Sequence, residues 1–303
     1  MQVDISYSRL KTFYYVATNR SFKTAALKLS VTEGAVSQAI KDLESKLETR
    51  LFDRSSRSVN LTAIGQNLFA IVAPVIEQLD HVVEEFEESK GRIYGKVKVA
   101  SFEVMLLTVF PQRLNIFNTT YPECEVILYN TSGQQLRSMV TNGDVDFGIG
   151  SLNNLPDDII GEEILQCDRC LITPLGHPLS RKKRVTLDDI AQHSIVVPDE
   201  GGSGGTGGKA AIDKLRAINP NLKVSMEAAG WHVVMKYVEL GFGISFLPEI
   251  ALQQDHKSLF CIPVSHLIGN SRYGILLKRG KYHSPAARKL MSFFLPDFDP
   301  QSK

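Results

Sequence analysis

The sequence predicts an α+β protein with an N-terminal winged helix-turn-helix, a long linker helix and a C-terminal domain of two α/β lobes. Three observations lead to this fold class. Short amphipathic helices followed by two short extended segments occupy residues 1–62. A long apolar stripe with no Lys or Arg follows, over residues 58–89. Beyond residue 96, strands alternate with helices of about ten residues, which is typical of α/β layers.

Composition places the 303-residue chain among globular proteins, with 43% hydrophobic and 22% charged residues. Residues 1–60 carry ten Lys or Arg and six Asp or Glu, whereas the whole chain has a net charge of only +1. This basic end predicts a local contact with a polyanion. The start of the chain does not read as a secretory signal, no apolar run is long enough to span a bilayer, and four cysteines suit a reducing compartment. We therefore expect a cytoplasmic protein without membrane contact.

Three short helices are predicted at the N-terminus. From Leu10, apolar residues at helical spacing form one face of the first. Ser21 can cap a second helix over residues 22–29, and Thr32 can cap a third that runs to about Leu47.

The third helix is predicted to have two contrasting faces. Val36, Ile40, Leu43 and Leu47 form a stripe that should be buried. The opposite face presents short polar side chains and one lysine: Glu33, Gly34, Ser37, Gln38, Lys41 and Ser45. Such side chains suit a helix that reads base edges in a major groove, although most polar helix faces are simply solvated.

Two short extended segments, residues 51–54 and 59–62, follow around a polar turn. Arg54 and Arg57 sit on this hairpin, where they could grip a DNA backbone or enter a minor groove. They could equally be ordinary surface arginines. Helix, turn, helix and basic hairpin in succession favour the DNA-binding interpretation.

The stretch SFKTAALKLSVTEGAVSQAIKDLESKLETRLFDRSSRSVNLTAIG, residues 21–65, resembles the winged helix-turn-helix of LysR-type transcriptional regulators. The resemblance implies binding to double-stranded DNA. The residues it assigns to DNA are base readers and phosphate contacts: Glu33, Ser37, Gln38, Lys41, Arg54 and Arg57. Gly34 departs from the Pro usual in the family, and Glu33 from the common Gln. Because Glu accepts hydrogen bonds but cannot donate them, Glu33 could favour a cytosine amino group.

A long helix is predicted next, capped by Thr62. Its apolar residues recur every three or four positions: Ile64, Leu68, Ile71, Val75, Leu79, Val82 and Phe86. This stripe could pair with a second copy of the chain or pack against its own domain. The family resemblance implies a dimerising linker helix, and assembly of dimers into a tetramer. Pro74 predicts a kink, because it removes a helical hydrogen bond.

The predicted domains are a DNA-binding domain over residues 1–64, a linker helix and hinge over 65–91, and a third domain over 92–303. The two lobes of this third domain should span about residues 96–166 plus 270–295, and about residues 167–269. Residues 92–295 resemble the effector-binding domain of LysR-type regulators, a periplasmic-binding-protein type II-like fold. The resemblance implies a small-molecule effector, which we expect to be a carboxylate or another anion, and no further cofactor.

Ligands in α/β layers bind at the carboxyl ends of strands, where helix N-termini favour anions. The polar or aromatic residues expected there are Ser101, Thr131, Ser132, Ser151, Ser203, Thr206 and Trp231. The run GGSGGTGGK, residues 201–209, lies between a predicted strand and a predicted helix. It misses the nucleotide-binding pattern at its first glycine and at the hydroxyl after Lys209, so we interpret it as an anion-binding turn.

No catalytic motif and no metal site is predicted. Cys167 and Cys170 form a C-x-x-C pair without a second ligand pair, and in an extended segment their thiols would point to opposite faces. We interpret them as incidental structural cysteines, and a redox switch is the alternative. The alternatives to a ligand-controlled DNA-binding regulator are a cytoplasmic solute-binding or sensor protein, and a nucleotide-dependent enzyme that uses the glycine-rich run.

Overall fold

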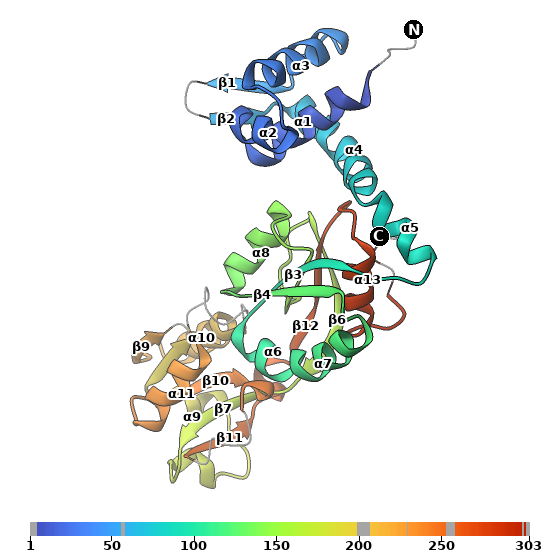
Figure 1. The fold of residues 1–303 in the computed structure, drawn as a ribbon. Helices are drawn as coiled ribbons and strands as arrows, with labels where there is room; N and C mark the ends of the chain where they lie inside the picture. Colours follow the sequence, from blue (N-terminus) through green and yellow to red (C-terminus); the bar gives the residue numbers. More distant parts are fainter. Residues whose placement is uncertain are drawn as a thin grey trace. The chain divides into compact units, whose positions relative to one another are not determined.

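The computed structural model describes residues 5–55, 58–198, 207–228, 230–252, 258–298 and 300. The chain forms two compact units, each visible in Figure 1. Unit 1 contains residues 1–91 with 280–284, and unit 2 contains residues 92–279 with 285–303.

Unit 1 begins with three helices, α1 (Tyr7–Asn19), α2 (Phe22–Leu29) and α3 (Glu33–Lys46). The predicted caps of α2 and α3 are confirmed, because the Ser21 side chain accepts from the Thr24 N–H and the Thr32 side chain accepts from the Ala35 N–H. The helices share one core, which contains Phe13 and Val16 of α1, the small pair of α2 and the apolar stripe of α3. In that stripe Val36, Ile40 and Leu43 are buried as predicted.

The hairpin that follows consists of β1 (Phe52–Ser55) and β2 (Ser58–Leu61), which pair antiparallel with Phe52 opposite Leu61. Glu44 of α3 holds its start, since one carboxylate oxygen accepts from the backbone N–H groups of Leu51 at 2.8 Å and Phe52 at 3.3 Å. The predicted hairpin is therefore present and attached to α3.

The long helix is divided into α4 (Ala63–Asp80) and α5 (Val82–Ser89). Thr62 caps α4 as predicted. The helix continues through Pro74, and its interruption lies at His81, with φ −103° and ψ 8°. The kink expected at Pro74 stays a prediction, and the interruption at His81 is a separate feature that the sequence did not indicate.

Residues 280–284 belong to unit 1 through contacts with this helix pair. The Tyr282 backbone N–H donates to Glu77 at 3.2 Å, and its hydroxyl donates to Glu85. The Tyr282 ring stacks on His81 with ring centroids 5.4 Å apart.

Unit 2 contains a five-stranded sheet in the order β4-β3-β5-β12-β6. Its strands are β3 (Gly95–Ser101), β4 (Cys124–Asn130), β5 (Phe147–Ser151), β6 (Ile159–Cys167) and β12 (Ser271–Lys278). The strands β3, β4 and β5 are parallel, as predicted, whereas β12 is antiparallel to both of its neighbours. The alternation of strands and helices along the chain predicts parallel strands. The strand β12, with which the chain returns to this sheet, is antiparallel and departs from that prediction.

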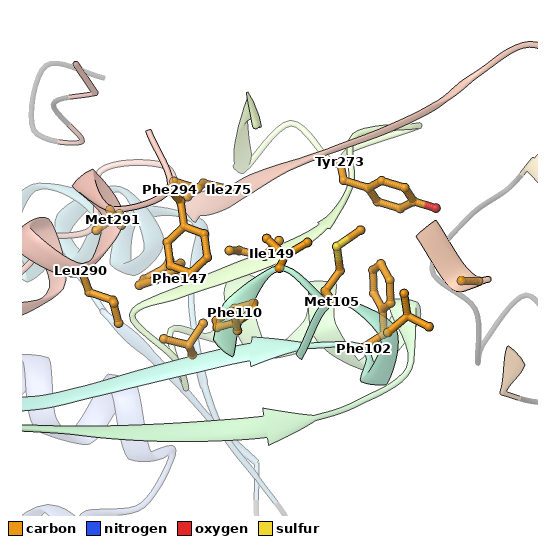
Figure 2. Packing of buried hydrophobic residues seen from close by; sticks show 14 of the residues in the cluster. Phe102, Met105, Phe110, Phe147, Ile149, Tyr273, Ile275, Leu290, Met291 and Phe294 are labelled. Carbon is orange, nitrogen blue, oxygen red and sulfur yellow. The ribbon is translucent and has the colours of Figure 1, made fainter. Parts of the chain in front are cut away.

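Alternate residues of these strands serve two different cores, as expected for the two faces of a sheet. On one face, α8 (Gly133–Asn142) packs with Ala100 and Leu276. On the other lie α6 (Glu103–Thr108), α7 (Phe110–Thr120) and α13 (Pro285–Ser292). Figure 2 shows this second core, where Phe110, Phe147 and Phe294 gather. The sequence predicts a single helix over residues 103–117, whereas the structure has two helices, α6 and α7, that are separated at Val109.

The remaining strands form two small sheets, ordered β10-β7-β11 and β8-β9. Their bounds are β7 (Arg169–Pro174), β8 (Ile195–Pro198), β9 (Val224–Ala228), β10 (Ser245–Pro248) and β11 (Leu259–Pro263). The helices of this part are η1 (Pro178–Arg181), α9 (Leu187–Ile190), α10 (Gly207–Ile218), α11 (Trp231–Glu239), η2 (Glu249–Ala251) and α12 (Ser265–Ile268). A core of its own, with Ile195, Leu215 and Phe246, stabilises this lobe.

A substitution of Gly65, in the first turn of α4, would test the packing of unit 1. A Cβ added there would lie 2.1 Å from the Leu51 carbonyl oxygen, whereas one added at Gly34 would meet nothing closer than 4.0 Å. We expect Gly65→Ala to destabilise unit 1 by about 1–3 kcal/mol through overpacking. The control Gly34→Ala should stabilise it by up to about 1 kcal/mol. Scanning calorimetry of the full chain measures both, and equal stabilities of the two variants would contradict the packing described.

Candidate functional site

The outer face of α3 is the first candidate site. Glu33, Gln38 and Lys41 are exposed there and Ser37 is half-buried, while Val36 and Ile40 on the opposite face are buried. The structure therefore brings four of the six proposed DNA-binding residues together on one helix. Arg54 belongs to β1 by its backbone, but its side chain and the whole of Arg57 lie outside the described residues.

A carboxylate that the sequence argument missed orients one of these side chains. The Gln38 amide nitrogen donates to Asp42 at 2.8 Å, one helical turn further along α3. The other Asp42 oxygen accepts from Arg9 of α1 at 3.3 Å. The four-residue spacing between Gln38 and Asp42 could have indicated this pair. The contact restrains the Gln38 amide and leaves its carbonyl oxygen and one N–H for a base edge.

The second candidate site is a cavity of about 350 Å³ in unit 2. It is lined by residues that follow β3 and β4 and by the start of α11: Phe102, Glu103, Val104, Asn130, Thr131, Ser132, Gln135, Gly230 and Trp231. Strands β3 and β4 are parallel, and Ser101 at the end of one lies opposite Asn130 at the end of the other. The cavity therefore lies at the carboxyl ends of parallel strands, where α/β proteins bind ligands.

Three of the seven proposed effector residues line this cavity, namely Thr131, Ser132 and Trp231. Ser101 is fully buried, and its hydroxyl donates to the Ile149 carbonyl at 2.7 Å, so it fastens β3 to β5. Ser151 is buried and accepts from the Asn153 N–H at 3.3 Å. Ser203 and Thr206 lie outside the described residues, as does most of the glycine-rich run, which occupies the interval between β8 and α10.

The electrostatics of the cavity combine two opposing features. Ser132 caps α8 and Trp231 opens α11, and a helix N-terminus favours an anion. Glu103 is the one charged side chain among the described lining residues, and it lies 3.2 Å from the Nδ1 atom of His232. The described lining thus contains no Lys or Arg to match an anionic ligand.

The cysteines are arranged differently from the sequence interpretation. Cys170 of β7 forms a disulfide with Cys261 of β11, and their Cα atoms are 5.6 Å apart. These strands are neighbours in one sheet, with Cys170 opposite Pro263 and Cys261 opposite Ile172. Cys170 is therefore not an unpaired structural cysteine, and its partner is 91 residues away rather than in the C-x-x-C pair. Cys167 is a free thiol, and burial raises its pKa, which lowers the fraction present as thiolate at neutral pH.

Within the described part of the chain, no group of three or more His, Cys, Asp or Glu side chains is arranged to hold a metal ion. No helix among these residues is both long and apolar enough to cross a membrane.

Two family descriptions match the chain. The bacterial regulatory helix-turn-helix of the lysR family matches residues 7–66, and the LysR substrate binding domain matches residues 90–299. The chain belongs to the LysR family. It is a LysR-type DNA-binding transcriptional regulator with an effector-binding domain.

Individual LysR relatives agree with this assignment. The HTH-type transcriptional regulator CysB of Burkholderia cenocepacia is 27% identical over 271 residues, which cover 88% of this chain and 85% of that protein. Full-length OxyR from Pseudomonas aeruginosa has a TM-score of 0.70 at 19% identity and covers 97% of this chain and 95% of its own. Full-length CbnR, solved in complex with its target DNA, has a TM-score of 0.55 at 16% identity, over 96% and 98% of the two chains. The curated relative is a transcriptional regulator and not an enzyme.

Proposed function

We propose that the protein binds DNA as a homodimer through α3 and the β1–β2 hairpin, and that a small anionic effector between the two lobes of unit 2 controls this binding. The observation that carries the proposal is the division of α3. Its apolar stripe is buried, so Glu33, Ser37, Gln38 and Lys41 are presented together. Ser37, Gln38 and Glu33 would read base edges, and Lys41, Arg54 and Arg57 would contact phosphates.

The helix pair α4–α5 supports the dimer. Seven apolar side chains on it are 45% to 69% exposed: Ile64, Ile71, Val75, Leu79, Val82, Val83 and Phe86. Leu68, which the sequence placed in the same stripe, packs against the core of unit 1 instead. Val72 and Ile76 of the same helix are buried in the core of unit 1. Because consecutive residues differ by about 100° around a helix, Ile71 and Val75 lie on a separate face that the unit does not cover. A second copy of this helix offers a matching apolar surface, and dimers of this kind would associate into a tetramer.

The cavity in unit 2 supports control by a small molecule. Its volume suits a ligand of a few to about a dozen heavy atoms, and its walls come from both lobes. Ser132 and Gln135 belong to α8, whereas Gly230 and Trp231 begin α11. A ligand that bridges the two helix N-termini would favour one arrangement of the lobes over another. Its binding would thereby shift the population of DNA-binding conformations.

Single substitutions on α3 should separate base reading from phosphate contact. We expect Lys41→Ala to weaken binding to specific and unrelated DNA alike, and to reduce the slope of log K against log salt by about 0.9. Gln38→Ala should leave that slope unchanged but reduce discrimination against substituted operators by about 1–3 kcal/mol at the affected base pair. Fluorescence anisotropy at several salt concentrations measures both effects.

The control for Lys41→Ala is Lys183→Ala, which removes the same charge from an exposed position in unit 2. It should change neither the affinity nor the salt slope. Equal effects of the two lysine variants would show that net charge, and not α3, determines DNA binding.

A charge on the exposed stripe of α4 should disrupt the dimer. Ile71 is 69% exposed in the single chain, so Ile71→Glu would not disturb the core of unit 1. We expect this variant to sediment as a 33.6-kDa monomer at concentrations where the parent chain is dimeric. Gln66→Glu is the matched control, because Gln66 is exposed on another face of α4. A dimer that survives Ile71→Glu would place the interface elsewhere.

A further inference from the structure

Arg169 is the one Lys, Arg, Asp or Glu that is buried in the described part of the chain, with 8% of its surface exposed. It is the first residue of β7, directly after the chain leaves the five-stranded sheet at Cys167. Its backbone is fixed on both sides, because its N–H donates to the Ser265 hydroxyl at 2.8 Å and its carbonyl accepts from the Val264 N–H at 2.8 Å. The backbone at the start of β7 is therefore held in place.

The guanidinium of Arg169 has no carboxylate partner among the described residues. Its Nε donates to the Ser271 hydroxyl at 3.0 Å. The titratable groups that act on it are the Tyr273 phenol and the Cys167 thiol. Burial raises the pKa of both groups above their ordinary values, so both are neutral at physiological pH. Burial also lowers the pKa of Arg169 itself.

An uncompensated charge in a protein interior is strongly unfavourable, and the usual remedy is an opposite charge within hydrogen-bonding distance. A guanidinium offers five N–H donors, of which the Nε–H is engaged with Ser271. None of the described residues accepts a hydrogen bond from the two terminal nitrogens, so both can bind a partner from outside the chain. Their planar, parallel N–H groups match the two oxygens of a carboxylate.

The surroundings of Arg169 belong to the same sheet edge as the cavity. Tyr273 of β12 lies opposite Ser151, the last residue of β5. Ser271 belongs to the same strand as Tyr273, and its hydroxyl accepts from Arg169. Figure 2 shows Tyr273 extending beside Phe102, with its hydroxyl at the end away from Ile275. The two rings are 5.6 Å apart between centroids, and Phe102 lines the cavity next to Trp231.

We propose that Arg169 is the charge partner of the effector, which binds through a carboxylate to the two terminal nitrogens of the guanidinium, with the Ser271 and Tyr273 hydroxyls beside it. This proposal rests on the proposed effector site and specifies its chemistry. Arg169, Ser271 and Tyr273 are not among the described lining residues, so the carboxylate would extend from the cavity past Phe102, whose ring contacts Tyr273, to reach the guanidinium. The apolar walls, Phe102 and Trp231, would then contact the remainder of the ligand.

The sole tryptophan of the chain makes the proposal testable without knowledge of the natural effector. Trp231 lines the cavity, so its fluorescence reports on that site. The full-length protein is titrated with sodium acetate, succinate and benzoate at constant ionic strength, and in parallel with acetamide, succinamide and benzamide. We expect a saturable fluorescence change with at least one carboxylate and a response at least tenfold weaker with its amide.

Two substitutions then assign the response to Arg169. Arg169→Gln should raise the Kd for the carboxylate at least tenfold and bring it close to that of the amide. Arg169→Lys, which keeps the charge but not the paired N–H groups, should give an intermediate Kd. Circular dichroism establishes that each variant is folded, and Ser271→Ala, which removes only the hydroxyl, is the milder variant should either fail. It should weaken carboxylate binding by a smaller factor.

The proposal is overturned if none of the three carboxylates changes the fluorescence, or if Arg169→Gln binds the carboxylate with an unchanged Kd. Equal binding of carboxylates and amides by the parent chain would leave the cavity as an effector site but remove Arg169 as its charge partner. Binding of inorganic sulfate in preference to all three carboxylates would also overturn it. DNA binding by the same preparations is measured separately, so loss of the proposed function itself would be recognised.

Discussion

The burial of Val36, Ile40 and Leu43 under α3 is the constraint on which the proposed DNA-binding surface depends. These three side chains are almost fully buried against Phe13, the small residues of α2 and the start of the hairpin. A helix has only one face to bury when it lies on the surface of a small unit, so this packing determines which side chains remain outside. The polar face of α3 remains outside the core for this reason. On it, the Asp42 carboxylate accepts a hydrogen bond from Gln38 and orients that side chain.

The same reasoning applies to α4, with a different result. Val72 and Ile76 face the core, but Ile71 and Val75, one position earlier in each case, remain exposed. A helix with two apolar faces on the surface of a small unit can bury only one of them against that unit. In the proposed dimer, the second face would be covered by the partner's α4, and this would connect the sequence pattern of α4 to the symmetry of the DNA that a dimer reads.

Local features of this chain could be predicted from the sequence, because they depend on neighbouring residues. The caps at Ser21, Thr32 and Thr62 and the apolar spacing along α3 are of this kind. The break at His81, the antiparallel return of β12 and the Cys170–Cys261 disulfide were missed. Each depends on contacts between residues far apart in the chain. Arg169 was missed for the same reason, because only the fold shows that it is buried without a carboxylate beside it.

The central claim is that the exposed face of α3 selects DNA sequences for a dimer. The most direct measurement is to incubate the full-length protein with fragmented genomic DNA of its source organism and to sequence the retained fragments. A parallel experiment uses the double variant Gln38→Ala with Lys41→Ala. We predict that the parent chain retains a few intergenic fragments containing an inverted repeat and that the double variant does not. Retention of the same fragments by both proteins, or of no sequence above background by the parent chain, would contradict the account.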